Sequence, residues 1–416
     1  MASRGAAQAA PFCYDSAVLL ARPAFTLLWC SRILSNVAFN MLGVAVGWQL
    51  YALTGRALDL GLVGLAQFAP IVLLTLVVGQ VADRYDRRLI AAMCQLVEAG
   101  AAAVLVAGSA RGWLSSTSIF ATVALVGAAR AFENPTTTAL VSDIVPKPLV
   151  ARAMAWLVSA TQTARIVGPA LGGFLYVIGP GATYLTAAAL FVGSGLCTAL
   201  IRSGRTARTP EPLVLESVLS GLVFINGQRV LLGTMSLDMF AVLLGGGATA
   251  LLPIYARDIL GTGPGGLGIL RSAPAIGALV TSLVLAYRPL QWRIGRTLFR
   301  AVFVFGAATV AFGISSSFAL SFLALGVLGA ADVVSVVIRS SLVQIRTPVT
   351  MLGRVSAVHS LFTGTSNQLG AFASGVVASL VGTVPAVLLG GIGTIAVAVL
   401  WILLFPELRR IRGFDD

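Results

Sequence analysis

Five ionisable residues stand inside long apolar stretches of this chain, where an unpaired charge is costly. They are Arg130, Glu133, Arg165, Asp332 and Arg339. At the centre of a bilayer each such charge costs roughly 2.5 to 3.5 kcal/mol on insertion scales, so these side chains must face protein or water. If these side chains line a polar cavity, they could bind protons or a charged ligand. If they lie between packed helices, they would form static ion pairs that fix the packing. Both interpretations stay open for Arg130, Glu133 and Asp332.

Polar side chains without charge stand in the same stretches. They offer hydrogen bonds to a polar ligand or, alternatively, to neighbouring helices. These residues are Asn36, Asn40, Gln162 and Gln368. Glu98, Asp238 and Arg271 lie nearer the edges of their stretches, where we favour a structural role. His359, the single histidine, is interpreted as a packing residue rather than a proton carrier.

The elements that position these residues are apolar segments of membrane-spanning length. Hydrophobic residues make up 57% of the 416 and charged residues 10%, a balance that a water-exposed surface could not accommodate. Stretches of about 20 apolar residues predict twelve spans, and helices are expected because lipid offers no partner to exposed backbone groups. The first six spans run near residues 25–53, 60–82, 89–110, 116–142, 150–178 and 183–201. The second six run near residues 230–256, 264–286, 297–314, 318–340, 354–379 and 384–405.

A repeat relates the two halves of the chain. The segment PKPLVARAMAWLVSATQTARIVGPALGG, from Pro146, aligns with PVTMLGRVSAVHSLFTGTSNQLGAFASG, from Pro348, 202 positions later. Duplicated halves of this kind are typical of membrane transporters. We therefore expect an all-α integral membrane protein with twelve transmembrane helices in two pseudo-symmetric six-helix bundles. The same offset places Asp332 where Arg130 lies in the first half, which predicts an Arg–Asp pair across a central cavity.

Basic residues are distributed unevenly between the predicted loops. Most of the 28 Lys and Arg residues fall on one side, whereas the opposite loops hold Arg56, Arg111 and Arg257. Because cytoplasmic loops carry the positive excess, both termini and the central segment are assigned to the cytoplasm. We predict an N-terminal bundle at 1–201, a cytoplasmic linker with a surface helix at 202–229, and a C-terminal bundle at 230–416. The net charge of +13 then reflects the basic loops on the cytoplasmic side of the membrane, and no nucleic-acid partner is expected.

A charged loop follows the second predicted span. Its sequence GQVADRYDRR, residues 79–88, resembles the loop signature of the major facilitator superfamily, with Asp86 in place of the second glycine. Glycine permits close backbone approach, the aspartate can face a basic partner, and the arginines hold the loop in the cytoplasm. The resemblance implies a conformational role for Gly79, Asp83, Arg84, Arg87 and Arg88.

The fifth predicted span contains the run GPALGG, residues 168–173. It resembles the motif that marks the exporter branch of this superfamily, although Ala155 and Ala164 stand where the fuller pattern has glycines. Proline cannot donate to the preceding turn, so a bend is predicted, and small residues let a neighbouring helix approach. The resemblance implies that this helix belongs to the conformational hinge. The motif residues are Gly168, Pro169, Gly172 and Gly173.

The longer stretch at 142–173 resembles the siderophore-exporter branch of the superfamily. This resemblance implies a monomeric carrier in the bacterial inner membrane that exchanges a small molecule, a siderophore, for protons across the lipid bilayer. Efflux of drugs or other metabolites, and uptake on the same fold, are alternatives. A membrane-embedded enzyme is disfavoured because the chain lacks HExxH, GxSxG and Walker sequences. The four cysteines lack metal-ligand spacing, so neither a metal nor a cofactor is expected.

Overall fold

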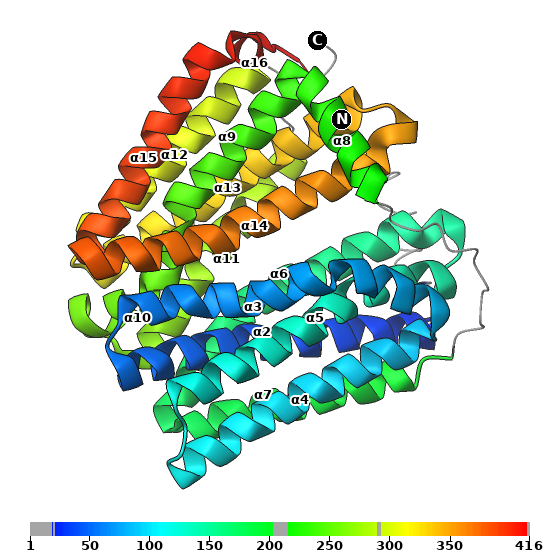
Figure 1. Cartoon of the computed structure of the whole chain (residues 1–416), viewed down its shortest axis with the longest axis vertical. Helices are drawn as coiled ribbons and strands as arrows, with labels where there is room; N and C mark the ends of the chain where they lie inside the picture. Colours follow the sequence, from blue (N-terminus) through cyan, green and yellow to red (C-terminus); the bar gives the residue numbers. More distant parts are fainter. Residues whose placement is uncertain (1–18, 20, 203–214, 289–292, 414–416) are drawn as a thin grey trace, which may run out of the picture. The chain divides into compact units, whose positions relative to one another are not determined.

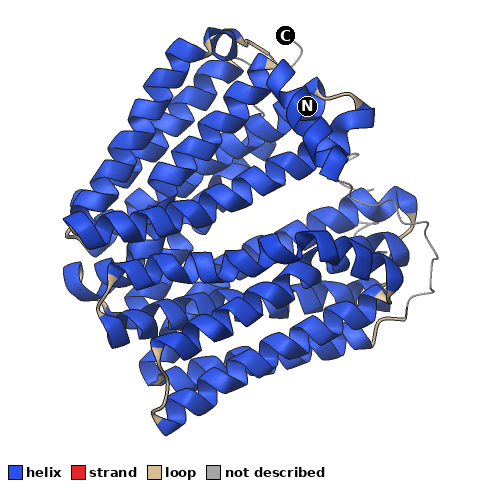
Figure 2. Cartoon of the chain, in the orientation of Figure 1, coloured by secondary structure: helices blue, strands red, loops and turns tan. Residues whose placement is uncertain are grey.

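The computed structural model describes residues 19, 21–202, 215–288 and 293–413, and nearly all of them are helical (Figure 1). Figure 2 shows helices joined by short loops and no strand in this described part of the chain. The all-α fold predicted from the apolar segments is therefore confirmed. The chain divides into two compact units: unit 1 comprises Met1–Ala45 and Ala69–Pro212, and unit 2 comprises Val46–Phe68 and Leu213–Asp416.

Unit 1 is a helical bundle. It holds the first part of α2, the second part of α3, and all of α4 to α7. The bounds are α2 Pro23–Thr54, α3 Ala57–Arg84, α4 Arg87–Arg111, α5 Ser116–Ile144, α6 Val150–Ile178 and α7 Pro180–Ala199. A short 3₁₀ turn, η1 at Lys147–Leu149, precedes α6.

Unit 2 holds the remaining parts of α2 and α3 together with the helices that follow α7. The bounds are α8 Leu215–Gly227, α9 Arg229–Gly245, η2 Gly246–Leu251, α10 Leu252–Ile254, η3 Tyr255–Ile259, α11 Gly263–Tyr287, α12 Ile294–Ile314, α13 Phe318–Arg346, α14 Val349–Val381, α15 Thr383–Leu404 and α16 Pro406–Arg410. Its core packs α12 and α13 against α9 and α15 around Phe299, Ile338 and Trp401.

Local sequence signals set the helix ends in unit 1. The Asp86 carboxylate caps α4 by accepting a hydrogen bond from the backbone N–H of Arg88 at 2.9 Å. Helix α4 stops at Gly112, whose φ of 70° lies in the left-handed region that glycine tolerates. Ser115 and Ser118 then cap α5 reciprocally. The connection between the two helices is therefore short and well defined.

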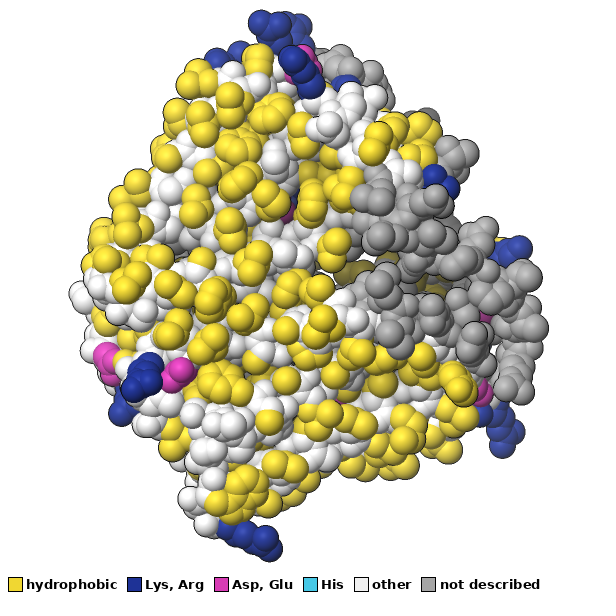
Figure 3. Space-filling model, in the orientation of Figure 1, with side chains coloured by type: hydrophobic (Ala, Val, Ile, Leu, Met, Phe, Trp, Pro, Cys, Tyr) yellow, Lys and Arg dark blue, Asp and Glu magenta, His cyan; other side chains and the backbone are white. Residues whose placement is uncertain are grey.

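The predicted spans coincide with long helices. Within the described residues, nine helical segments are long and apolar enough to cross a membrane. The other three predicted spans correspond to α5, α6 and α14, which have 29, 29 and 33 residues but more polar sequences. Exposed hydrophobic side chains such as Val177, Leu185 and Leu403 lie on the outside of these bundles. Figure 3 shows hydrophobic side chains over much of one face, with Lys and Arg toward its margins.

The seventh predicted span differs from a continuous helix. The structure ends α9 at Gly245, continues through the 3₁₀ segment η2, and closes with a π-helical turn, η3. Three consecutive glycines begin the break, and a Cβ at Gly247 would overlap Ser374 and Gly370 of α14. Close packing against α14 and weak helix propensity together explain why the regular α-helix stops there.

Glycines of the predicted exporter motif bring α6 close to α2 within unit 1. A Cβ at Gly168 would lie 2.7 Å from the Asn40 Cβ, and one at Gly172 would lie 2.9 Å from the Met41 Cα and carbonyl oxygen. Pro169 lies between them inside α6 and is buried. The two helices can approach this closely only because positions 168 and 172 lack side chains.

Candidate functional site

A cluster of buried charges lies inside unit 1, between α4 and α5. Arg130 is 5% exposed, and Glu98 and Glu133 are both 0% exposed. The Arg130 Nε lies 3.2 Å from Glu98 Oε1, and its Nη1 lies 3.5 Å from Glu133 Oε2. One guanidinium therefore forms ion pairs with two carboxylates, both of which are shielded from water.

Helix α2 also contacts the Arg130 guanidinium. Its Nη2 donates to the Ser35 carbonyl at 2.9 Å and to the Ser35 hydroxyl at 3.1 Å, and its Nη1 donates to Asn36 Oδ1 at 3.2 Å. The Phe39 ring centroid lies 4.2 Å from the guanidinium carbon. These contacts hold the guanidinium in place by charge-assisted hydrogen bonds and a cation–π contact.

Glu133 is well supplied with hydrogen-bond donors. Its Oε1 accepts from the Ser35 hydroxyl at 2.7 Å and from the Gln95 amide at 2.9 Å.

A second guanidinium, that of Arg32 on α2, lies in the same region. It donates to Asn134 Oδ1 at 3.1 Å and to Thr137 Oγ1 at 2.8 Å, both on α5. Polar groups from α2, α4 and α5 thus converge on this part of unit 1.

The hydrogen-bonded network continues from Gln95 to α7. The Gln95 amide also donates to the Ser31 hydroxyl at 3.0 Å and accepts from Thr198 at 2.9 Å. The Ser31 hydroxyl in turn shares hydrogen bonds of 2.7 Å with Thr198 and 2.9 Å with Ser194. A connected buried network of this kind fixes four helices because each unmade bond would leave a desolvated polar group.

Spacing along each helix builds this network. Gln95 and Glu98 are three apart on α4, as are Arg130 and Glu133 on α5, while the serines of α2 and the hydroxyl residues of α7 are four apart. Residues three or four apart share one helix face. The α5 pair was predicted from its spacing, whereas Glu98 was expected to be structural. Sequence reasoning missed five further network residues: Gln95, Ser31, Ser35, Ser194 and Thr198. Polar pairs one turn apart in otherwise apolar segments were the available signal.

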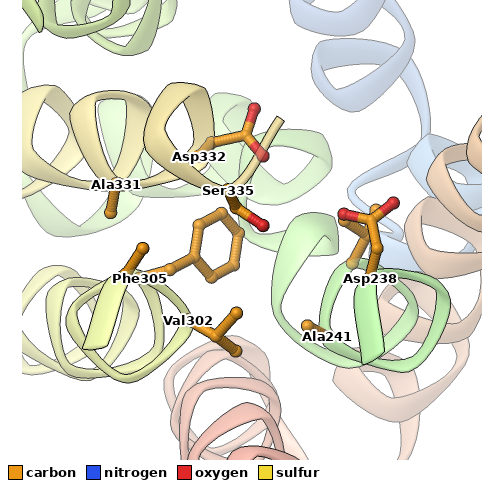
Figure 4. Close-up of a pocket in the computed structure, with 9 residues that line it drawn as sticks. Asp238, Ala241, Val302, Phe305, Ala331, Asp332 and Ser335 are labelled. Carbon is orange, nitrogen blue, oxygen red and sulfur yellow. The ribbon is translucent and has the colours of Figure 1, made fainter. Parts of the chain in front are cut away.

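Unit 2 contains a separate pocket lined by two aspartates. Asp238 of α9, Asp332 and Ser335 of α13, and Phe305 of α12 contribute to its wall. Figure 4 shows Phe305 projecting from α12 toward Ser335. The buried carboxylate of Asp238 forms an ion pair with the buried guanidinium of Arg339. Asp332, a candidate from the sequence, therefore lies beside a mostly apolar pocket with carboxylates in its wall.

The neutral candidates in unit 1 lie on α2 and α6. Asn36 bonds Arg130, and the Asn40 amide donates to the Asn36 carbonyl at 2.8 Å. Arg165 is exposed halfway along α6 and donates to Gln162 Oε1 at 3.3 Å. The predicted Arg130–Asp332 pair stays a prediction, since the contacts described for Arg130 are all within unit 1.

Gln368 lies on α14 in unit 2. Its Oε1 is 2.9 Å from the position that a Cβ at Gly64 would occupy, so the side chain packs beside the first part of α3, which belongs to the same unit. His359, also on α14, is partly buried among the helices of this unit.

Within the charged loop after α3, the structure describes the side chains of residues 85–88. Arg87 forms an ion pair with Asp143 of α5 at 3.1 Å, and Arg88 donates to the Ile201 carbonyl at 2.8 Å. These arginines tie the start of α4 to the ends of α5 and α7. The predicted roles of Gly79 and of the Asp83 and Arg84 side chains fall on positions that lie outside the described residues.

The chemistry available to these groups is the binding of protons, ions or polar molecules. Within the described residues, no group of three or more His, Cys, Asp and Glu side chains is arranged to hold a metal ion. Glu98 and Glu133 of unit 1 pair with Arg130, whereas Asp238 and Asp332 of unit 2 border a pocket, and Asp238 also pairs with Arg339. Such intramembrane ionisable groups mark the paths of ions and substrates through membrane proteins.

Comparison with known proteins gives one family for nearly the whole chain. Residues 16–413 match the family described as transmembrane secretion effector. The enterobactin exporter EntS of Shigella flexneri is 25% identical over 420 residues, covering 95% of this chain and 95% of that protein. The enterobactin exporter EntS of Citrobacter koseri is 26% identical over 421 residues, again covering 95% of each chain.

Solved structures of transporters share the fold. The nucleoside transporter NupG has a TM-score of 0.69 and 14% identity, covering 92% of this chain and 99% of that one. A POT family transporter in complex with 5-aminolevulinic acid has a TM-score of 0.73 and 11% identity, covering 92% of this chain and 96% of that one. At these identities the likeness concerns the fold alone.

Proposed function

Since the chain belongs to the transmembrane secretion effector family of the major facilitator superfamily, we propose that it exports a small molecule, a siderophore, from the cytoplasm in exchange for protons. The chain is a multi-pass membrane transporter and not an enzyme. The observation that carries the proposal is the extent of its similarity to enterobactin exporters, which covers 95% of both chains. A match of this length includes both halves of the repeat.

The proposed transport cycle is alternating access. Two bundles of six helices rock about a substrate site near the middle of the membrane, and a carboxylate is protonated from the outer side before substrate leaves. Buried charges in unit 1 and the aspartate-lined pocket of unit 2 support this mechanism. The proposed substrate and proton pathway includes Arg130, Glu133, Arg165, Asp332, Asn36, Asn40, Gln162 and Gln368.

The proposed arrangement in the cell follows from the charge distribution and the relatives. The protein lies in the bacterial inner membrane as a monomer with both termini in the cytoplasm and twelve spans. The N-terminal bundle at 1–201, the linker at 202–229 and the C-terminal bundle at 230–416 stay proposals for the boundaries. The close α2–α6 packing at Gly168 and Gly172 supports a conformational role for the exporter motif.

Everted membrane vesicles test the exchange directly. Respiration acidifies their lumen, and candidate siderophores are added to the outside, which corresponds to the cytoplasmic face. Proton-coupled export predicts that substrate enters and that the lumen loses protons, so a lumenal pH dye reports alkalinisation. Vesicles from cells without the protein are the control. Normal acidification with no response to any siderophore would contradict antiport of this substrate class.

An uptake carrier is the second candidate. Ala155 and Ala164 replace glycines of the exporter pattern, and this departure favours it. Ala164 is nevertheless buried beside Val37 and Met41 and is small enough for close α2–α6 packing. In the vesicle experiment, an uptake symporter moves substrate together with protons out of the lumen. It would respond to substrate loaded inside the vesicles and not to substrate added outside.

A further inference from the structure

We infer that Glu98 and Glu133 of unit 1, held by the single guanidinium of Arg130, form a proton-binding site and that Glu98 carries the proton. The role of this site in coupling rests on the proposed function, whereas proton binding itself does not. The proton carrier then lies in the first half of the chain, whereas Asp332 lies in the second half. It rests on depth, charge balance and hydrogen bonding within unit 1.

Both carboxylates stand deep along their helices. Glu98 is eleven residues from the start of α4 and thirteen from its end. At 1.5 Å per residue these separations correspond to about 17 Å and about 20 Å. Glu133 stands roughly 17 Å from the end of α5 by the same measure. Both carboxylates therefore lie close to the middle of spanning helices, far from either aqueous surface.

Charge balance within the cluster also favours a bound proton. Two carboxylates that are 0% exposed contact one guanidinium, that of Arg130. Arg32, on α2, is the further charged group facing this region. Its guanidinium keeps its charge, is half-buried, hydrogen-bonds Asn134 and Thr137, and forms no ion pair with either carboxylate among the described contacts. Helix α7 presents the hydroxyls of its two polar residues to the network and no charge. An uncompensated buried carboxylate is costly, and one bound proton removes that cost.

The two carboxyl groups differ in their hydrogen-bond donors. Glu133 accepts from Ser35 and Gln95, whereas no described donor is aligned to hydrogen-bond either oxygen of Glu98. The Arg130 guanidinium approaches one oxygen of each carboxyl group, so both share one cation. Because Glu98 lacks the donors that stabilise the negative charge of Glu133, Glu98 is the group that takes the proton. Glu133 then remains the charged partner of Arg130.

The proton-binding step needs no reactant other than a proton from water. A proton from water forms an O–H bond with one Glu98 oxygen, and the group of three formed by Glu98, Glu133 and Arg130 changes from one net negative charge to none. Arg130 then keeps one carboxylate partner instead of two. Loss of the proton restores the second ion pair. Because Arg130 also bonds Ser35 and Asn36 of α2, each change at Glu98 alters the forces between α4, α5 and α2.

Infrared difference spectroscopy tests proton binding without any transported ligand. The full-length protein is reconstituted in lipid vesicles, and spectra are recorded as the pH is stepped. Wild type should show the C=O stretch of a buried carboxylic acid. Glu98→Gln should lose this band entirely. Glu133→Gln should lose it as well, because the remaining carboxylate and Arg130 then balance. Glu407→Gln, at an exposed carboxylate paired with Arg229, should keep the band.

Several outcomes would overturn the inference. They are a wild-type spectrum without the band, a band that persists in Glu98→Gln, and a band lost only in Asp332→Asn. Monodisperse elution and a native circular-dichroism spectrum confirm that each variant is folded. The outcome is separable from that of the vesicle experiment. A Glu98-dependent band without siderophore-driven proton release keeps the site and refutes the proposed function, whereas release without the band does the reverse.

Discussion

The glycines of α6 allow a sharp test of how closely two helices must pack. A Cβ at Gly172 would lie 2.9 Å from the Met41 Cα and carbonyl oxygen, whereas ordinary contacts lie at 3.4–4 Å. The clashing atoms are backbone, so no side chain can rotate away, and α2 and α6 must separate by about 0.5 Å or more. Overpacking of this kind costs about 1–3 kcal/mol. Gly172→Ala should therefore lower stability despite the helix propensity of alanine.

Gly100 provides the matched control in the same unit. It lies within α4, and a Cβ there would meet nothing within 4 Å. Gly100→Ala should leave stability unchanged or raise it by about 0.5–1 kcal/mol through helix propensity. Thermal unfolding of both purified variants, followed by intrinsic fluorescence, measures the difference. An unfolding temperature for Gly172→Ala equal to that of Gly100→Ala would refute the packing argument.

Three further predictions concern charge and hinge residues. Asp238→Asn should destabilise the protein by about 3–5 kcal/mol because it leaves the buried Arg339 guanidinium without its partner. The double variant with Arg339→Met should recover much of the lost stability, measured by thermal unfolding. No recovery of stability would argue against the pair. Asp332→Asn should abolish transport while surface expression persists, because Asp332 lines the pocket of unit 2 that belongs to the proposed substrate pathway. Retained transport with an unchanged pH profile would eliminate Asp332 from that pathway. Gly168→Leu should disrupt transport by forcing α6 from α2, so wild-type flux would count against a hinge at this contact.

The helices were largely predictable from the sequence because each apolar span is a local property. The span predicted at 150–178 coincides with α6, and the one at 116–142 differs from α5 by two residues. The break after Gly245 was not predicted. It depends on the approach of α14 at Gly370 and Ser374, and contacts between segments distant in sequence leave no periodic signal.

The candidate site was predictable only within single helices. The three-residue spacing of Arg130 and Glu133 placed both side chains on one face of α5, and the structure brings them together. The ion pair between Arg130 and Glu98 joins different helices, so no spacing along the chain could reveal it. The pairing of Asp238 with Arg339 escaped prediction for the same reason.

The amount of siderophore outside cells tests the central claim of export most directly. Producing cells with the gene, without it, and with the gene restored are compared at equal density, and siderophore is measured in medium and cells. Export predicts less siderophore in the medium and more in the cells when the gene is absent, with both reversed on restoration. Equal amounts in the medium of all three strains would contradict siderophore export by this protein.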